Sequence, residues 1–487
     1  MNRSLTHRPW SPLHARWPAT IAAALLLAVL MPHTARPAEM RAGAAQVVIT
    51  PPEGTPMAGY YHARGASGVL DDLYSRALVL DDGTHRIALV ALDLISTTRP
   101  LTELARTAIE QATGIPGAHV LIAATHAHTG PVLADTSART EIPEDPPEGR
   151  QATLAYAATL PGRIAESVRL ANAARTNVQI SAATGRCEGL AYNRRFYLTD
   201  GSVAWNPGKG NPDIVLPAGV TDPEVAVVLV EPPHAPGRWV PAHAALVNFA
   251  MHPDTTGGTR ISADFPGALA RRMAEYHGGE CVTLFANGTC GNINHLDVEW
   301  PRSQSSPQEA QRIATILAAA VFQTEKSLRL VPSGPLRVAS ELVSLPLPEF
   351  PAEEVAQARL DVRMANDRTR EGFMKLVRAC KVLDVAAREG RPLEVEVQVL
   401  SVGDDLAWVS LPGEVFVELG LAIKQRSPFR QTMIIELANG SIGYIPDRRS
   451  YAEGNYEPVS ARCAAGSGEQ LVEVAVRLLR SLHVGGP

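Results

Sequence analysis

Cysteine is scarce in this 487-residue chain, and no two cysteines form a Cys-x-x-Cys pair. The five cysteines are Cys187, Cys281, Cys290, Cys380 and Cys463. Without a Cys-x-x-Cys pair, a zinc site built from thiolates is not expected. In an exported protein one or two disulfides are possible, and the odd count then leaves at least one thiol free. The sequence does not specify the pairing.

An excess of basic residues is also missing. The chain has 45 Lys and Arg against 50 Asp and Glu, a net charge of −5. Because nucleic-acid binding depends on neutralising phosphates, this balance argues against a nucleic-acid partner. Long apolar runs are absent after residue 40, so we expect no membrane span. The sequence does not specify the oligomeric state.

The first 38 residues differ from the rest and have the pattern of a secretory signal peptide. Arg3, Arg8 and Arg16 precede an apolar run at 19–31, which is followed by small residues as far as Ala38. An uncleaved anchor is the less favoured interpretation because the apolar run is short for a membrane span. No twin-arginine pair precedes the run. We therefore predict a protein exported as residues 39–487, and more acidic than the full chain.

Apolar segments and amphipathic segments alternate along residues 39–487, which predicts an α/β fold. The segments 76–80 and 87–92 flank Asp81-Asp82-Gly83, a strong hairpin signal. Other expected strands lie at 47–50, 119–124, 177–183, 224–231, 242–250, 282–286, 393–401, 406–410 and 431–437. Expected helices lie near 100–113, 151–174, 266–277, 307–328 and 468–483, and 352–388 reads as one long helix or a hairpin of two. We predict a single large mixed-sheet domain with helices packed outside and a metal site at strand ends.

The most informative motif is Thr125-His126-Ala127-His128-Thr129-Gly130-Pro131, directly after the apolar run at 119–124. Ligands and metals are often held at the carboxyl ends of strands in α/β proteins. Histidine is the commonest metal ligand and a proton carrier at neutral pH. The two imidazoles can serve one site in different roles. The alternative is a pair of polar residues that cap a strand.

Polar residues follow other apolar strands in the same way. His252 ends the segment 242–250, and Glu414 follows 406–410 and would open a helix, where the helix dipole favours a carboxylate. Tyr444 lies after 431–437, and a Gly- and Asn-rich loop at 287–295 follows 282–286. Two imidazoles, one carboxylate and one further oxygen suit a tetrahedral catalytic zinc. Asp264 can support a ligating histidine or cap the helix that follows it.

Five segments, taken in order over roughly residues 42–460, resemble the catalytic domain of the neutral, non-lysosomal ceramidase family. The segments are Ala124–Pro131, Ala191-Tyr192-Asn193-Arg194, Phe249–Pro253, Leu411-Pro412-Gly413-Glu414, and Gly443-Tyr444-Ile445 with Tyr451 and Tyr456-Glu457.

The resemblance implies hydrolysis of an N-acyl amide bond at a zinc ion. It implies that the zinc ligands are His126, His252, Glu414 and Tyr444. It also implies that the substrate site is lined by His128, Asn193, Arg194 and Tyr456. From the residues themselves, His128 suits proton transfer, Tyr444 can be a ligand or donate to an oxyanion, and Arg194 can bind a substrate oxygen or form a structural salt bridge.

The chain departs from the family at a serine long regarded as catalytic, because Asn294 occupies its position. Asparagine can only donate or accept hydrogen bonds there, so we expect Asn294 to contribute to catalysis by positioning the substrate. Zinc-activated water is then the expected nucleophile. We also expect no C-terminal immunoglobulin-like domain. The leading interpretation is an exported, zinc-dependent amide hydrolase acting on a ceramide-like lipid. The alternatives are a metal-dependent ester hydrolase and a catalytically inactive relative that binds a lipid or glycan.

Overall fold

The computed structural model describes Met1 and residues 39–133, 147–235, 238–363 and 369–484. The proposed signal peptide, residues 1–38, lies outside the described residues apart from Met1. Residues Glu39–Pro487 form one compact unit. Among the described residues, no helix is both long enough and apolar enough to cross a membrane.

Three mixed sheets enclose a shared core. The first has the order β4-β3-β2-β1-β5, the second β13-β12-β11-β6-β15, and the third β16-β17-β18-β20. The first sheet comprises β1 (Arg41–Val48), β2 (Tyr74–Asp81), β3 (Arg86–Leu92), β4 (Val120–Ala124) and β5 (Thr176–Asn177). The second comprises β6 (Gln179–Arg186), β11 (Glu224–Glu231), β12 (Ala244–Phe249), β13 (Val282–Asn287) and β15 (Arg329–Leu330). The third comprises β16 (Leu336–Leu345), β17 (Leu393–Val402), β18 (Leu406–Ser410) and β20 (Gln431–Ile435).

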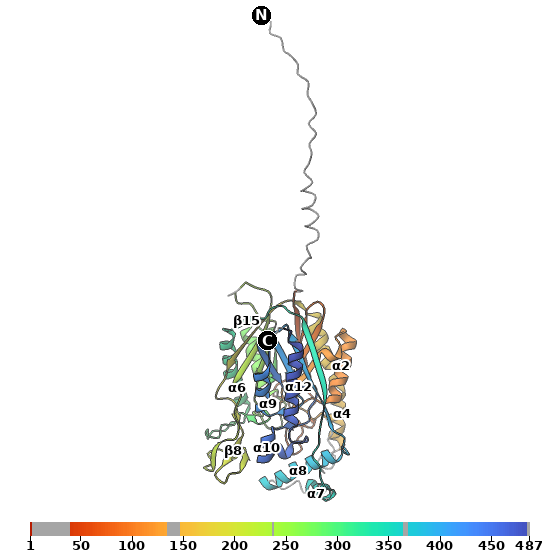
Figure 1. Cartoon of the computed structure of the whole chain (residues 1–487), viewed down its shortest axis with the longest axis vertical. Coiled ribbons are helices and arrows are strands. Elements are labelled where there is room, and N and C mark those ends of the chain that lie inside the picture. Colours follow the sequence, from red (N-terminus) through yellow and green to blue (C-terminus); the bar gives the residue numbers. More distant parts are fainter. Residues whose placement is uncertain (2–38, 134–146, 236–237, 364–368, 485–487) are drawn as a thin grey trace. The chain divides into compact units, whose positions relative to one another are not determined.

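The core between the sheets is apolar because one face of each sheet contributes to it. Leu78, Leu246 and Trp408, one from each sheet, belong to the same buried cluster. The opposite face of each sheet is covered by helices, as Figure 1 shows for those labelled. These helices are α2 (Arg99–Thr113) and α4 (Pro147–Ala173) on the first sheet, α5 (Asp264–Tyr276) and α6 (Pro307–Glu325) on the second, and α9 (Val417–Arg426) and α12 (Ser467–Leu482) on the third. The predicted α/β class with helices outside is therefore confirmed.

Each main sheet ends in a parallel strand pair, and the three pairs bring their carboxyl ends together. The pairs are β3–β4, β12–β13 and β18–β20. Backbone hydrogen bonds connect the ends of these pairs: Ala124 N donates to Leu437 O at 3.1 Å and Glu436 N donates to Asn287 O at 3.0 Å. The loops that follow these strands therefore meet in one place, although they are far apart in sequence.

Smaller elements surround this meeting point. The short strands are β7 (Tyr192–Asn193) with β14 (Ile293–Asn294), β8 (Arg195–Leu198) with β9 (Val203–Trp205) and β10 (Ile214–Pro217), and β19 (Glu414–Val415) with β21 (Tyr444–Ile445). The short helices are α10 (Arg448–Glu453) and α11 (Tyr456–Ser460). The pair α7 (Ala352–Arg363) and α8 (Arg370–Ala386) packs at the lower end of the unit in Figure 1, with α11 against α8.

Most predicted elements are present, and the hairpin around Asp81–Gly83 is confirmed as β2–β3. The turn is held by the Asp81 carboxylate, which accepts a hydrogen bond from Gly83 N at 2.9 Å. The prediction that Glu414 opens a helix is wrong. Glu414 instead lies in β19, beside Tyr444 in β21, and α9 begins only at Val417. The five cysteines are buried, and none of them forms a disulfide in the described part of the chain.

Candidate metal centre

His126, His252 and Glu414 come from the ends of three different sheets and meet at one point. His126 follows β4, His252 follows β12, and Glu414 follows β18. Glu414 Oε2 lies 3.4 Å from His126 Nε2 and 3.2 Å from His252 Nε2. His126 has a φ of 76°, in the left-handed region that is strained for a residue with a side chain. Such strain clusters at functional sites.

The orientation of both imidazoles is fixed by backbone carbonyls. His126 Nδ1 lies 2.7 Å from Ile95 O, and His252 Nδ1 lies 2.8 Å from Cys290 O. A carbonyl oxygen only accepts, so each Nδ1 carries a proton and donates. In the neutral ring, each Nε2 then presents a lone pair to the centre of the site. Metal-ligating histidines are commonly fixed in this way.

The chemistry of these three groups suits a cation. Two imidazole lone pairs and one carboxylate oxygen face one another at hydrogen-bond distances, and none of them is a donor in that state. Burial lowers the pKa of His252, to about 3. Burial works against ionisation of Glu414, but His126 lowers the pKa of this carboxyl well below its usual range. Neutral imidazole and ionised carboxylate are the states that bind metals.

His126 is the exception in the protein alone. Burial works to lower its pKa, but the Glu414 carboxylate reverses the effect and raises the pKa above its ordinary value. A proton on His126 then provides the positive charge that the carboxylate requires. A divalent metal with imidazole and carboxylate ligands would provide the same charge, so the residues present fit a zinc ion.

His128 lies beside the other two histidines. Its Nε2 lies 3.2 Å from His126 Nε2, and the ligand atoms of His126, His128 and His252 all lie within 4.8 Å of one another. Burial and then the neighbouring His126 lower the pKa of His128 well below its usual value. The sequence predicts a proton carrier at this position, whereas the geometry also allows His128 to be a ligand.

Tyr444 and Tyr456 lie beside the histidines. Glu414 and Tyr444 are direct partners in the parallel pair of β19 and β21. The ring of Tyr444 meets that of Tyr456 edge-on at 5.4 Å, and Tyr456 stacks on Trp205 at 4.4 Å. Burial raises the pKa of Tyr444 well above its ordinary value, although Arg194 works in the other direction. Tyr444 is therefore a neutral phenol that can donate a hydrogen bond.

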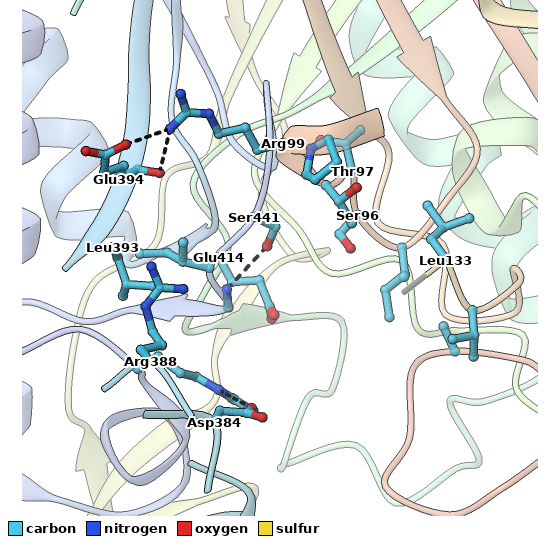
Figure 2. Close-up of a pocket in the computed structure, with 18 of the residues that line it drawn as sticks. Ser96, Thr97, Arg99, Leu133, Asp384, Arg388, Leu393, Glu394, Glu414 and Ser441 are labelled. Atoms are coloured by element: carbon cyan, nitrogen blue, oxygen red, sulfur yellow. Dashed lines mark hydrogen bonds and ion pairs between the residues drawn. The ribbon is translucent and has the colours of Figure 1, made fainter. Parts of the chain in front are cut away.

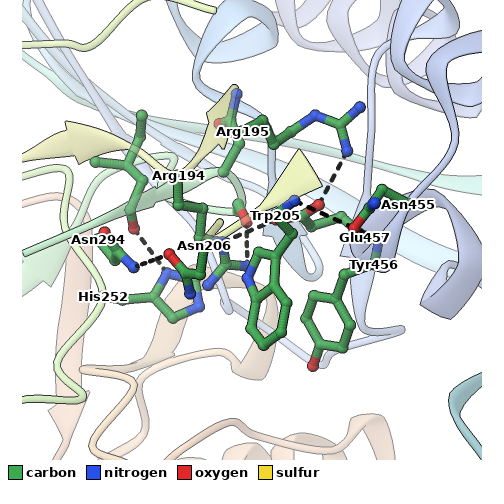
Figure 3. Close-up of polar contacts among 12 residues, drawn as sticks. Arg194, Arg195, Trp205, Asn206, His252, Asn294, Asn455, Tyr456 and Glu457 are labelled. Carbon is green, nitrogen blue, oxygen red and sulfur yellow. Dashed lines mark hydrogen bonds and ion pairs between the residues drawn. The ribbon is translucent and has the colours of Figure 1, made fainter. Parts of the chain in front are cut away.

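Arg194 forms a buried structural salt bridge, shown in Figure 3. Its Nε donates to Glu457 Oε1 at 2.9 Å, and one terminal nitrogen donates to Gly291 O at 2.6 Å. Arg195 donates to the second oxygen of Glu457 at 3.0 Å. The Arg194 guanidinium also lies over the ring of Tyr444, 5.4 Å from its centre. The structural alternative for Arg194 is thus realised, and a contact with substrate stays a prediction.

Asn193 and Asn294 use their amides within the protein. Asn294 Nδ2 donates to Asn206 Oδ1 at 3.0 Å, and its Oδ1 accepts from Leu296 N at 3.0 Å. Asn193 Nδ2 donates to Val220 O at 3.0 Å. Both side chains are buried, and Figure 3 shows Asn294 near His252. Their predicted roles in catalysis and in substrate binding stay predictions.

Asp264 does not contact a histidine ligand through any hydrogen bond in the described part of the chain. Its carboxylate accepts hydrogen bonds from Thr255 N at 2.9 Å and Thr256 N at 2.8 Å. It also accepts from Phe265 N at 2.7 Å, at the start of α5. Asp264 therefore ties the loop after His252 to the beginning of α5.

Two cavities meet at His126 and Glu414, which line both of them. The larger has a volume of about 1230 Å³ and is lined by His126, Glu414 and many polar and charged side chains, among them Ser96, Arg99, Arg388 and Glu394 (Figure 2). The smaller has a volume of about 210 Å³. Its walls include His126, His128, Glu414 and four tyrosines, namely Tyr60, Tyr61, Tyr444 and Tyr456. The metal centre thus lies where the two cavities join.

Sequence reasoning missed the segment 58–64, which supplies Gly59, Tyr60 and Tyr61 to the smaller cavity. It also missed Arg462, which lines both cavities. The one local signal was the pair Tyr60-Tyr61 directly after Gly59 in a segment without apolar periodicity.

Comparison with known proteins gives a match in structure only. No family model matches the sequence, and no curated protein matches it. The crystal structure of neutral ceramidase from Pseudomonas aeruginosa is similar, with a TM-score of 0.68 and 17% sequence identity over 92% of this chain and 75% of that chain. A structure described as ceramidase complexed with C2 gives a TM-score of 0.67 and 16% identity over 92% of this chain and 76% of that chain. The resemblance in fold to neutral ceramidase, expected from five short segments, is confirmed.

Proposed function

We propose that the protein is an exported metal-dependent hydrolase that uses zinc to cleave the N-acyl amide bond of a ceramide-like lipid. The observation that carries the proposal is the convergence of His126, His252 and Glu414 at the junction of two cavities. The similarity in fold to neutral ceramidase supports the reaction class. The apolar run at 19–31, typical of a signal peptide, supports export.

The two cavities support a substrate in which the cleaved bond joins unlike groups. The cavity of about 210 Å³ has tyrosine walls and suits the part of one substituent that lies next to the cleaved bond. The cavity of about 1230 Å³ is large enough for a long substituent with polar groups. An amide placed at the junction would present its carbonyl to the metal centre and one substituent to each cavity.

The chemistry that a bound zinc ion supplies is Lewis acidity and activation of water near neutral pH. His126, His252 and Glu414 would hold the ion, and Tyr444 is the strand partner of Glu414. Tyr444, a neutral phenol, would donate a hydrogen bond to the carbonyl oxygen as negative charge develops there. His128 would carry a proton to the leaving nitrogen. The Arg194 guanidinium, 5.4 Å from the centre of the Tyr444 ring, would hold that ring in place.

The amide of Asn294 is engaged by Asn206 and Leu296, so the family's serine has no nucleophilic counterpart at this position. The proposal therefore relies on activated water. The same arrangement of residues can hydrolyse an ester. If it catalysed no reaction, it could still bind a lipid. These are the outcomes that the experiment has to separate.

The experiment is fatty-acid release from short-chain and long-chain ceramides by the purified protein, with and without a chelator. We expect release that is abolished by the chelator, restored by zinc, and absent in His126→Ala and Glu414→Ala. Glu414→Ala should lose its metal and keep its circular dichroism spectrum. The matched control is His85→Ala, which removes an exposed histidine at the β2–β3 turn and should keep both metal and activity.

Release that persists in the presence of the chelator would contradict the metal-dependent reaction. A folded, zinc-loaded protein that releases fatty acid from no amide but hydrolyses esters would be an esterase. If it turned over neither class of substrate yet bound ceramide, it would be a binding protein.

A further inference from the structure

His128 is held in place by the segment 58–64. The guanidinium of Arg64 donates to His128 O at 2.9 Å and also to Ala58 O. Gly59 lies so close to His128 that a methyl group on Gly59 would be 2.7 Å from His128 O and 3.0 Å from His128 Nδ1. The ring of Tyr60 meets the His128 ring nearly edge-on, with 6.0 Å between centroids. The imidazole therefore has little freedom to rotate.

The Nδ1 atom of His128 is in a different situation from those of His126 and His252. It is buried, and it has no hydrogen-bond partner among the described residues. The carboxylate of Asp254 faces this atom, with its Oδ1 3.8 Å from His128 Nδ1. A buried donor without a partner costs about 1–3 kcal/mol. At 3.8 Å the two atoms lie just beyond hydrogen-bond distance.

The carboxylate of Asp254 is itself anchored. Tyr60 donates from its hydroxyl group to Asp254 Oδ1 at 2.6 Å. Burial first, and then the charge of Asp254, raises the pKa of Tyr60, so that its hydroxyl stays a donor. Arg64 lies over the Tyr60 ring, 4.1 Å from its centre, and fixes that ring in turn. Asp254 is thus set between a fixed donor and the imidazole of His128.

We propose that Asp254 is a positioning residue that accepts the Nδ1 proton of His128 and so directs the Nε2 atom of His128 at the reacting groups. Tyr60 holds Asp254 for this task. The arrangement selects one tautomer of the imidazole, as a carboxylate behind a histidine commonly does. The inference rests on the proposed function, in which His128 transfers a proton and is not a metal ligand.

The test compares the zinc-loaded full-length protein with Asp254→Asn and Tyr60→Phe. We expect kcat for the amide to fall about 10- to 100-fold in Asp254→Asn, the range found when an outer partner of a site histidine is removed. KM and zinc content should stay unchanged. Tyr60→Phe removes one hydrogen bond that anchors the Asp254 carboxylate and should lower kcat by less than Asp254→Asn does. Asp213→Asn, an exposed aspartate, is the matched control and should match the wild type in all three quantities.

A second readout does not depend on activity. Nitrogen-15 spectra of labelled histidine side chains should show His128 protonated at Nδ1 in the wild type and a mixture of tautomers in Asp254→Asn. If the protein proves inactive toward amides, this change would still support the positioning role while the proposed function fails. An unchanged His128 signal in Asp254→Asn would overturn the proposal. So would loss of zinc in Asp254→Asn, because His128 would then be a metal ligand.

Discussion

Glu457 offers a sharp test of the energetics beneath the site. Its side chain is fully buried, and its two oxygens accept from two different arginines. Arg194 Nε donates at 2.9 Å and Arg195 donates at 3.0 Å. Both guanidiniums are almost completely buried. We predict that Glu457→Gln, which keeps the shape and removes the charge, destabilises the fold strongly.

The magnitude follows from the contacts that change. Two hydrogen bonds to a charged group contribute about 1.5–3 kcal/mol each. The glutamine amide keeps one acceptor, so that part of one bond survives. It also leaves two buried cations to share their remaining partners, and breaking a buried pair costs about 3–5 kcal/mol. We therefore expect a loss of about 3–5 kcal/mol, a large fraction of the usual 5–15 kcal/mol of a folded domain.

The assay is urea denaturation in the presence of a chelator, so that metal binding does not contribute. The matched control is Glu453→Gln. Glu453 also pairs with Arg195, at 3.1 Å, but it lies in a less buried position. We expect the control to lose less than half as much. A loss below about 1 kcal/mol for Glu457→Gln, or one no larger than that of the control, would refute the reasoning. It would also free Arg194 for a role on the substrate.

Two further predictions concern residues around the site. Lys381 is buried, and burial lowers its pKa from 10.5 to about 8. The unfolded chain therefore binds this proton more tightly than the folded protein, and the stability of the fold rises as the pH increases from about 8 to 10.5. Lys381→Met should therefore stabilise the protein at pH 7 by about 2 kcal/mol, a figure that already subtracts the lost hydrogen bond to Pro458 O. This gain in stability should shrink as the pH rises toward 10.5. A gain no larger than that of Lys375→Met, at an exposed lysine, would contradict the prediction. Gly59→Ala should lose most activity, because the new methyl group would collide with His128. The variant also carries backbone strain, since Gly59 has a φ of 101°. Gly54→Ala carries similar backbone strain at a φ of 82° but meets no neighbour, so activity measurements on the two variants separate displacement of His128 from strain alone.

The sequence predicted the local elements well because apolar periodicity and turn residues act over short distances. It correctly predicted that polar residues after β4, β12 and β18 would gather, because each ends an apolar strand. The metal-ligand roles of His126, His252 and Glu414 stay predictions. The helix expected at Glu414 was wrong because pairing of β19 with β21 overrides the local preference for a helix start.

What escaped the sequence are contacts between a side chain and a distant backbone atom. His252 Nδ1 donates to Cys290 O, and Arg64 donates to His128 O. Such contacts leave no pattern in the sequence, because every residue type has a backbone carbonyl that can accept the hydrogen bond. The same holds for Asp254 and Tyr60, which are 194 positions apart. Only the assembled fold shows that they face the same imidazole.

The position of the candidate ligands also explains why no single short motif contains the whole site. Each of the three comes from a different sheet, and backbone bonds such as Ala124 N to Leu437 O align the sheet ends independently of the ligands. The side chains then need only to point inward, and the carbonyls of Ile95 and Cys290 fix the two imidazoles. A site organised in this way depends on the packing of all three sheets.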